Sequence, residues 1–272
     1  MLNLISIEFF KLRNTRYFWV LSGLFIVFLV AVPLGIHGFM EFLTEKGETI
    51  ADLPVKPNEI PLFDFVDIWQ NMSWIYKGFS LFISFVIVIS VCNEFSYGTV
   101  KQNIIDGLSR QQFLISKIGF IVAYSLAMVL IATLILITAG LFWSPVQGMN
   151  FVTENIEFMG GYFLHLVGFQ LFSLVLALLI KRSGIVIAFL TFYVYVIEFI
   201  AGNLLQYNWD LEWVADLLPV RALLNIIPFP FGKYALRESQ NFIGMGELGI
   251  LLGYILLYVG IAYWLVSKRD IR

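Results

Sequence analysis

Residues 118–143 read IGFIVAYSLAMVLIATLILITAGLFW and contain no charged side chain. The hydrocarbon core of a bilayer is about 30 Å thick, so a helix that spans it needs roughly 20 mostly apolar residues. Backbone polar groups must be satisfied internally in lipid, and the alternation typical of a membrane barrel is absent. The stretch therefore predicts a transmembrane helix.

Similar apolar runs recur along the whole chain. They cover residues 17–39, 73–93, 161–180, 184–204 and 248–266. Hydrophobic residues make up 60% of the 272 residues and charged residues only 13%, against about 25% charged in a soluble domain. The sequence predicts an all-α membrane protein whose single domain, residues 1–272, has six transmembrane helices.

The basic residues of the short connecting segments gather on one side of this topology. That side carries Lys11, Arg13, Arg16, Lys101, Arg110, Lys117, Lys181, Arg182, Lys268, Arg269 and Arg272. Loops rich in Lys and Arg stay in the cytoplasm. An even number of spans then places both termini in the cytoplasm.

The chain has few of the residue types that several classes of function require. Cys92 is the only cysteine, and His37 and His165 are the only histidines, so we expect no metal site. The phosphate-binding pattern GxxxxGK[ST] is missing, and an intramembrane protease would need a gathered set of catalytic groups. We expect no catalytic residue, no bound cofactor and no nucleic-acid partner for this chain.

Residues 1–16, ahead of the first span, have helical periodicity. Leu2, Ile5, Phe9 and Leu12 fall on one face, and the charged residues fall mostly elsewhere. This pattern is typical of an amphipathic helix lying in the cytoplasmic interface. The alternative is a short extension of the first spanning helix.

The longest cytoplasmic connection, residues 94–117, reads EFSYGTVKQNIIDGLSRQQFLISK. Its length predicts a short helix between two turns, and Gly98 and Gly107 are the expected boundaries. The loop resembles that of type-2 ABC transporter permeases, which share an acidic residue, a Gly-Thr pair and a Ser-Arg pair leading to a lysine. Here these are Glu94, Gly98, Thr99, Ser109, Arg110 and Lys117.

The resemblance also covers EFFKLR at residues 8–13 and the apolar segment 217–232. It implies a permease subunit, an exporter of the bacterial inner membrane, whose loop 94–117 is a coupling helix against a separate ATPase. ATP and magnesium would bind to that ATPase. A second permease copy or a paralogue would complete a dimer surrounded by membrane lipid.

The external segment 204–247 is interrupted by Pro219, Pro228 and Pro230. It predicts either a re-entrant element or an ordinary interfacial loop. Glu198 is a carboxylate inside a predicted span, where a charge is costly. As a functional residue it would line a pathway or gate, or pair with Arg221 or Lys233. The alternative is a residue that is protonated or that reaches the outer surface.

Two other functions remain open from sequence alone. One is an ATP-independent secondary transporter or channel, which Glu198 would favour. The other is a non-transporting ABC subunit that does mechanical or regulatory work at the envelope. The long first external loop, residues 40–72, is in either case a candidate contact for an extracytoplasmic partner.

Overall fold

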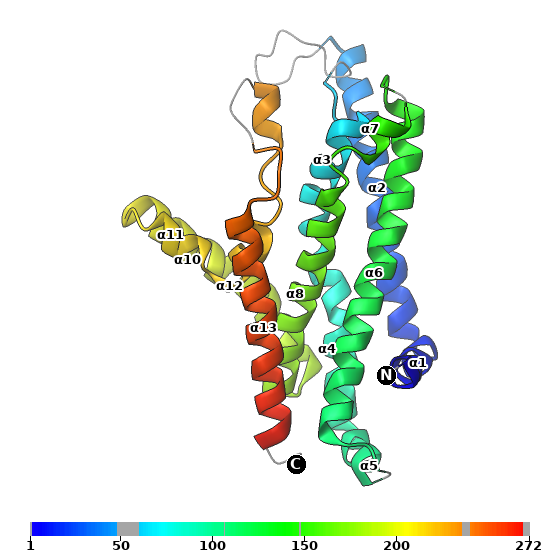
Figure 1. The fold of residues 1–272 in the computed structure, drawn as a ribbon, viewed down its shortest axis with the longest axis vertical. Helices are drawn as coiled ribbons and strands as arrows, with labels where there is room; N and C mark the ends of the chain where they lie inside the picture. The colour runs from blue at the N-terminus through cyan, green and yellow to red at the C-terminus, as the bar shows by residue number, and fades with distance from the viewer. Residues whose placement is uncertain (1, 48–59, 106, 147, 236–239, 269–272) are drawn as a thin grey trace.

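The computed structural model describes the chain except for residues 1, 48–59, 106, 147, 236–239 and 269–272. Its described residues form helices and turns and no strand (Figure 1). Five helices are long and apolar enough to cross a membrane, and one bent pair passes the same test when its halves are taken together. The protein is thus an all-helical chain with the character of a multi-pass membrane protein.

The described helices follow one another along the chain. Their bounds are α1 Leu2–Arg13, α2 Arg16–Glu45, α3 Phe65–Lys77, α4 Ser80–Ser96, α5 Thr99–Ile105, α6 Arg110–Trp143, α7 Met149–Thr153, α8 Glu157–Ile180, α9 Ser183–Phe192, α10 Glu198–Asn203, α11 Glu212–Asp216, α12 Pro219–Leu224 and α13 Met245–Lys268. Two π-helical segments, η2 Tyr193–Ile197 and η3 Leu204–Asn208, flank α10, and the 3-10 helix η4 covers Phe231–Ala235.

The predicted span 73–93 is not one straight helix. It belongs to α3 and α4, whose axes differ by 49° across the break at Gly78 and Phe79. The helix before the break begins at Phe65, and its polar Gln70 and Asn71 are buried inside the protein. A scan for apolar residues misses this half because burial in protein, rather than lipid, accommodates its polar side chains.

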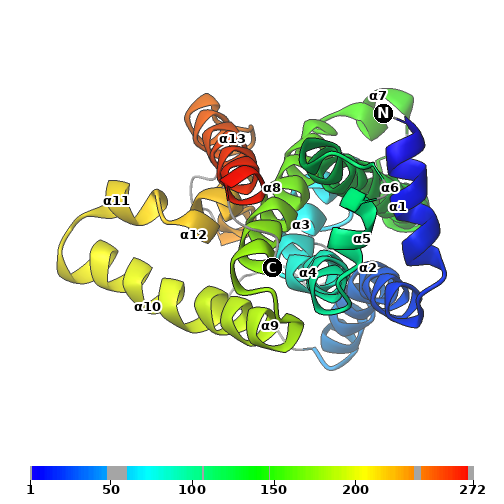
Figure 2. The same ribbon diagram turned by 90° about the horizontal axis from the view of Figure 1, so that it is seen from below.

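Helix α8 is the centre of the bundle. It packs against α3, α4, α6 and α13, which surround it in the view along the bundle (Figure 2). Within its most apolar window 78% of the residues are buried, against 17% for the helix Ser183–Asn208. The first is therefore a core helix, and the second lies at the periphery.

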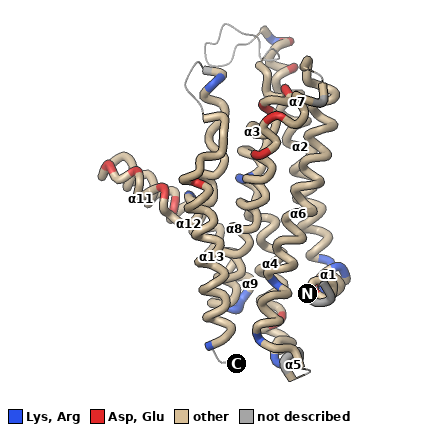
Figure 3. The backbone as a smooth tube through the Cα atoms, in the orientation of Figure 1, with Lys and Arg blue, Asp and Glu red and all other residues tan. Residues whose placement is uncertain are grey.

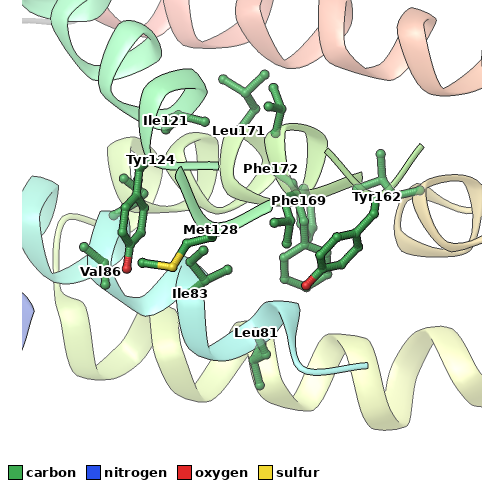
Figure 4. Close-up of a cluster of buried hydrophobic side chains, with 14 of the residues drawn as sticks. Leu81, Ile83, Val86, Ile121, Tyr124, Met128, Tyr162, Phe169, Leu171 and Phe172 are labelled. Carbon is green, nitrogen blue, oxygen red and sulfur yellow. The ribbon is translucent and has the colours of Figure 1, made fainter. Parts of the chain in front are cut away.

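The core between α4, α6 and α8 is built from large apolar side chains (Figure 4). Ile83 and Val86 of α4 meet Met128 of α6 there. Some of its polar groups are paired, since the Ser22 hydroxyl lies 2.6 Å from the Tyr124 hydroxyl, whereas the buried Tyr162 hydroxyl has no hydrogen-bond partner among the described residues. Polar groups buried in an apolar medium need such partners.

The peripheral helix leads away from the bundle. Figure 2 shows α9 and α10 running outward from the bundle, and α11 and α12 returning toward α13. Pro219 occupies the first turn of α12, where its missing N–H costs nothing. The external segment predicted at 204–247 therefore contains α11, α12 and η4, and its residues 236–239 lie outside the described part.

The amino-terminal helix α1 is separate from α2. A turn at Asn14 and Thr15 divides them, and the Thr15 hydroxyl donates to the Leu12 carbonyl at 2.6 Å. Figure 1 shows α1 nearly end-on while α2 runs along the long axis. Helix α1 therefore lies across the direction of α2, at the side of the bundle next to α6 (Figure 2), instead of extending α2.

Candidate functional site

A buried ion cluster joins α1, α4 and α6 at one end of the bundle. The Lys117 ammonium donates to Glu8 Oε2 at 2.6 Å and to Glu94 Oε1 at 2.8 Å. Lys11 reaches Glu8 Oε1 at 3.1 Å from the more exposed side. The side chain of Lys117 is only 2% exposed. We call these four residues the ion cluster.

The Glu8 side chain lies on the buried face of α1, contrary to the sequence-based expectation that its charged residues point mostly away. Ile5 and Leu12 share this face, and Ile5 packs close to Gly119 of α6. Burial alone would raise the pKa of Glu8, but the ammonium groups of Lys117 and Lys11 outweigh it and lower the pKa below the ordinary value. Glu8 is therefore a charged anchor for α1.

Helix α5 projects beyond the ion cluster at the same end of the molecule (Figure 3). Gly98 and Gly107 bound it with φ angles of +69° and +101°, which glycine adopts without strain. The Thr99 hydroxyl donates to the main-chain carbonyl of Glu94 at 3.2 Å. The predicted short helix is thus present, and its start is tied to the residue that binds Lys117.

The return from α5 into α6 is fixed by a capping box. The Ser109 hydroxyl accepts from the Gln112 N–H at 3.1 Å, while the Ser109 N–H donates to Gln112 Oε1 at 2.8 Å. Arg110 donates to the carbonyl of Ser267, near the end of α13, at 3.1 Å. Helix α6 therefore starts at Arg110, within the segment that the sequence assigned to the loop.

The six residues predicted from the loop pattern are divided between these contacts. Glu94 and Lys117 meet directly, Ser109 caps α6, and Arg110 links the start of α6 to the end of α13. Sequence reasoning missed Glu8 and Lys11 as partners. A signal existed, because an acidic residue on the inward face of an amphipathic helix needs a buried cation.

A second polar arrangement holds α12 by both ends. Glu198 Oε1 accepts from the Arg221 main-chain N–H in the first turn of α12, at 2.5 Å. At the other end the Lys77 ammonium donates to the carbonyls of Leu224 and Ile227 at 2.8 and 2.7 Å. An anion at the start of a helix and a cation at its end both interact favourably with the helix dipole.

Glu198 therefore does not form the expected ion pair with the side chain of Arg221 or Lys233. Its carboxylate binds the backbone of Arg221, while the Arg221 guanidinium lies 3.6 Å from Asp216 and also donates to Gln206. Lys233 instead pairs with Asp67 at 2.7 Å. Glu198 is 5% exposed, so it does not reach toward the outer surface.

The two arrangements lie on a helical scaffold whose charges are segregated. Lys and Arg dominate the end with α1, α5 and the last turn of α13, and acidic residues are concentrated toward the other end (Figure 3). Such a scaffold, with buried ionic groups joining its helices, defines a polytopic helical membrane protein. A comparison with curated proteins finds no match.

The chain belongs to the family described as "Protein of unknown function (DUF2705)", whose model matches residues 50–272. The match includes α5, Lys117, Glu198 and Arg221. It does not include α1, which contributes Glu8 to the ion cluster.

Proposed function

We propose that this chain is the membrane-spanning permease subunit of an ABC exporter. In this proposal α3 and α4 count as one broken span, giving six spans with both termini in the cytoplasm. Helix α1 lies in the cytoplasmic interface, α11 and α12 form the re-entrant element, and α5 is the coupling helix. The membrane is the plasma membrane of a bacterium.

The observation that carries the proposal is the position of α5 between the two helices that hold the ion cluster. Glu94 lies before α5 and Lys117 lies after it, and their side chains bind each other and Glu8. A force applied to α5 would therefore reach α1, α4 and α6 together. A partner that hydrolyses ATP needs such a mechanical connection to shift the bundle between two arrangements.

Exposed apolar side chains at the two ends of α5 support the proposal that this helix contacts another protein. Tyr97 is 79% exposed and Ile105 is 78% exposed, at the basic end that the proposal places outside the hydrocarbon. Large apolar groups exposed to water favour contact with another protein. The partner in this proposal is a cytoplasmic ABC ATPase, which carries the ATP and magnesium.

In the proposed dimer, the two permease subunits would meet at a surface of α13 that other parts of the chain do not cover. Gly249 and Gly253 of α13 have no neighbouring atom where a side chain would begin. Small residues let membrane helices approach closely. A second copy or a paralogue is therefore expected to pack there. Of the predicted outer loop 40–72, residues 40–45 belong to α2 and residues 65–72 to α3, which leaves the segment 46–64 for an extracytoplasmic partner.

The test is affinity purification of the tagged chain in mild detergent, with identification of bound proteins and an assay of ATP hydrolysis. We expect an ABC ATPase to copurify, and to be lost from Tyr97→Ser and Ile105→Ser variants. Phe151→Ser is the matched control, since Phe151 is an exposed aromatic residue of α7 at the opposite end. Absence of any nucleotide-binding partner after crosslinking would overturn the proposal.

An ATP-independent transporter is the second candidate, and the buried Glu198 is the observation in its favour. Ionisable groups at membrane depth commonly bind transported ions or substrates. This candidate predicts uptake or efflux in proteoliposomes without ATPase and driven by an ion gradient. A non-transporting ABC subunit would instead recruit the ATPase but move no substrate.

A further inference from the structure

A cavity of about 440 Å³ lies between α3, the end of α12 and the start of α13. Trp74, Lys77, Asp216, Asn225, Phe229 and Glu247 are among the residues that line it. Figure 2 shows the same region, with α12 beside α8 and α13. Its volume falls within the range of roughly 300–1,000 Å³ that small-molecule sites occupy. Phe229 at its edge is exposed, so the cavity is open to its surroundings.

Hydrogen bonds and ring contacts fix the walls of this cavity. The Gln70 amide of α3 donates to the carbonyl of Gln240 at 2.8 Å and to that of Pro228 at 3.4 Å. The rings of Trp74 and Phe229 meet edge to face, with their centres 5.1 Å apart. Binding sites for small molecules are usually preformed in this way.

Lys77 brings a positive charge to the cavity without a carboxylate beside it. Two of its N–H groups donate to the carbonyls of Leu224 and Ile227 at 2.8 and 2.7 Å, and its nitrogen lies 5.2 Å from the centre of the Trp74 ring. The third N–H has no acceptor among the described residues, and no described carboxylate forms an ion pair with Lys77. A cation held away from water needs an anion.

Two carboxylates line the same cavity and differ in their partners. Asp216 lies 3.6 Å from the Arg221 guanidinium and accepts from the Asn225 amide at 3.0 Å. Glu247 forms no ion pair within the described part of the chain, and its carboxylate lies against Gly244, which has no side chain in the way. The cavity therefore contains one cation and one anion that lack counter-ions.

This arrangement of charge restricts the kind of ligand. A ligand with only negative charge would bind Lys77 but be repelled by Glu247, and one with only positive charge would meet the reverse. A zwitterion complements both groups. A phosphodiester is a much weaker base than a carboxylate, so it keeps its charge where burial disfavours ionisation.

We propose that this cavity binds a zwitterion whose phosphodiester accepts from Lys77 and whose ammonium group donates to Glu247. The rings of Trp74 and Phe229 pack against its carbon atoms. The site deepens the proposed function by giving its substrate class, and its role in transport rests on that function.

A zwitterion of this kind has two sources, the headgroup of phosphatidylethanolamine and a free molecule such as glycerophosphoethanolamine. The short-chain lipid dihexanoylphosphatidylethanolamine separates them in dodecyl maltoside, a detergent without charge. Affinity for this lipid that is about tenfold or more above that for glycerophosphoethanolamine would identify the lipid, because buried acyl carbons add to binding. Equal affinity would identify the free molecule.

The test is calorimetric titration of both zwitterions into the full chain. We expect saturable binding. Dimethyl phosphate and ethanolamine each lack one charge and should bind about tenfold or more weakly than glycerophosphoethanolamine. Dihexanoylphosphatidylglycerol lacks the ammonium group and should show the same loss relative to dihexanoylphosphatidylethanolamine. Failure of both zwitterions to bind, or equal binding of the ligands that lack a charge, would overturn the proposal.

Two variants test the charged residues. Lys77→Gln keeps N–H donors for the carbonyls that Lys77 binds but removes the charge, and Glu247→Gln removes the opposite charge without altering those contacts. Each should weaken binding by about tenfold or more. Equal binding by either variant would overturn the assignment, and Glu247→Gln decides the outcome if Lys77→Gln does not fold.

Lys101→Gln and Glu154→Gln are the matched controls. Both residues are exposed and lie outside the cavity, and their substitution changes the net charge of the chain by the same amounts. Their affinity for each zwitterion should equal that of the unmodified chain. A loss as large as that of the cavity variants would show that net charge alone attracts the ligand, and would overturn the site.

These measurements use no ATPase. Failure to bind either zwitterion would therefore reject this site and leave the permease proposal intact. Failure to recruit an ATPase, with binding retained, would reject the permease proposal and leave the site.

Discussion

Lys117 of α6 binds Glu8 of α1 at 2.6 Å, although 109 positions separate them in the chain. The contact is completed by Glu94 of α4. This ion cluster connects α1 to α4 and α6, the helices that come before and after α5 along the chain.

The first prediction concerns loss of the central cation. Lys117→Gln leaves Glu8 and Glu94 buried without their shared ammonium, and breaking a buried pair in this way costs about 3–5 kcal/mol. The apparent melting temperature should fall markedly. Cys92 is the only cysteine and is buried, so its reaction with a thiol-reactive dye reports unfolding.

Lys101→Gln is the control for this measurement, since Lys101 is an exposed lysine of α5. Its melting temperature should stay close to that of the unmodified chain. Equal stability of the Lys117 and Lys101 variants would show that the ion cluster contributes nothing to the fold.

The second prediction concerns acid. The pKa of Glu8 is lowered in the folded protein from its ordinary value of 4.5. Its stabilising contribution is therefore complete above that value and is lost as the pH falls through the lower folded-state pKa. We expect α1 to detach in this acidic range.

A spin label at Phe10→Cys, in a Cys92→Ala background, would report this detachment as increased mobility. Phe10 is exposed, so the label does not disturb the buried face of α1. A Glu8→Gln variant should lose the pH response. A label that remains immobile through acid unfolding of the rest of the bundle would contradict the role of Glu8.

The third prediction concerns the start of α6. Ser109→Ala removes the side-chain half of the capping box, which is worth about 1 kcal/mol. Amide hydrogens in the first turn, at Gln112 and Phe113, should exchange faster. Thr138→Ala, an exposed hydroxyl near the other end of the same helix, should leave that turn unchanged, and equal exchange in both variants would argue against the cap.

The fourth prediction concerns Gly202 of α10. A Cβ atom there would lie 2.6 Å from Arg221 Nη1, closer than a contact allows. Gly202→Ala should displace the guanidinium from Gln206 and Asp216 and loosen α12. Crosslinking between cysteines placed on α10 and α12 should decrease.

Gly184→Ala is the control for Gly202, because no atom lies within 4 Å of its added Cβ. Alanine favours a helix by about 1 kcal/mol over glycine, so this variant should be neutral or slightly stabilised. A Gly202 variant with unchanged crosslinking would show that Arg221 adapts without cost.

The all-helical class was predictable because long apolar runs have a direct physical meaning in a bilayer. The positions of α6, α8 and α13 follow from such runs. Gly98 and Gly107 also marked the ends of α5 correctly, since few other residues accept positive φ angles.

Other features depend on contacts that no local pattern contains. The bend after Lys77 is one example, because Gln70, Asn71 and Ser73 before it are polar and are buried only by the tertiary fold. The partner of Glu198 is another. Sequence suggested the charged side chain of Arg221, whereas the structure uses its main-chain N–H, which every residue except proline possesses.

The central position of α8 also has a consequence for biosynthesis. Its buried surface is completed by α13, which is translated after α3, α4 and α6. A chain truncated before Met245 would therefore expose one side of its core helix to lipid or to quality-control proteases. Packing around α8 is therefore complete only once α13 has joined the other helices.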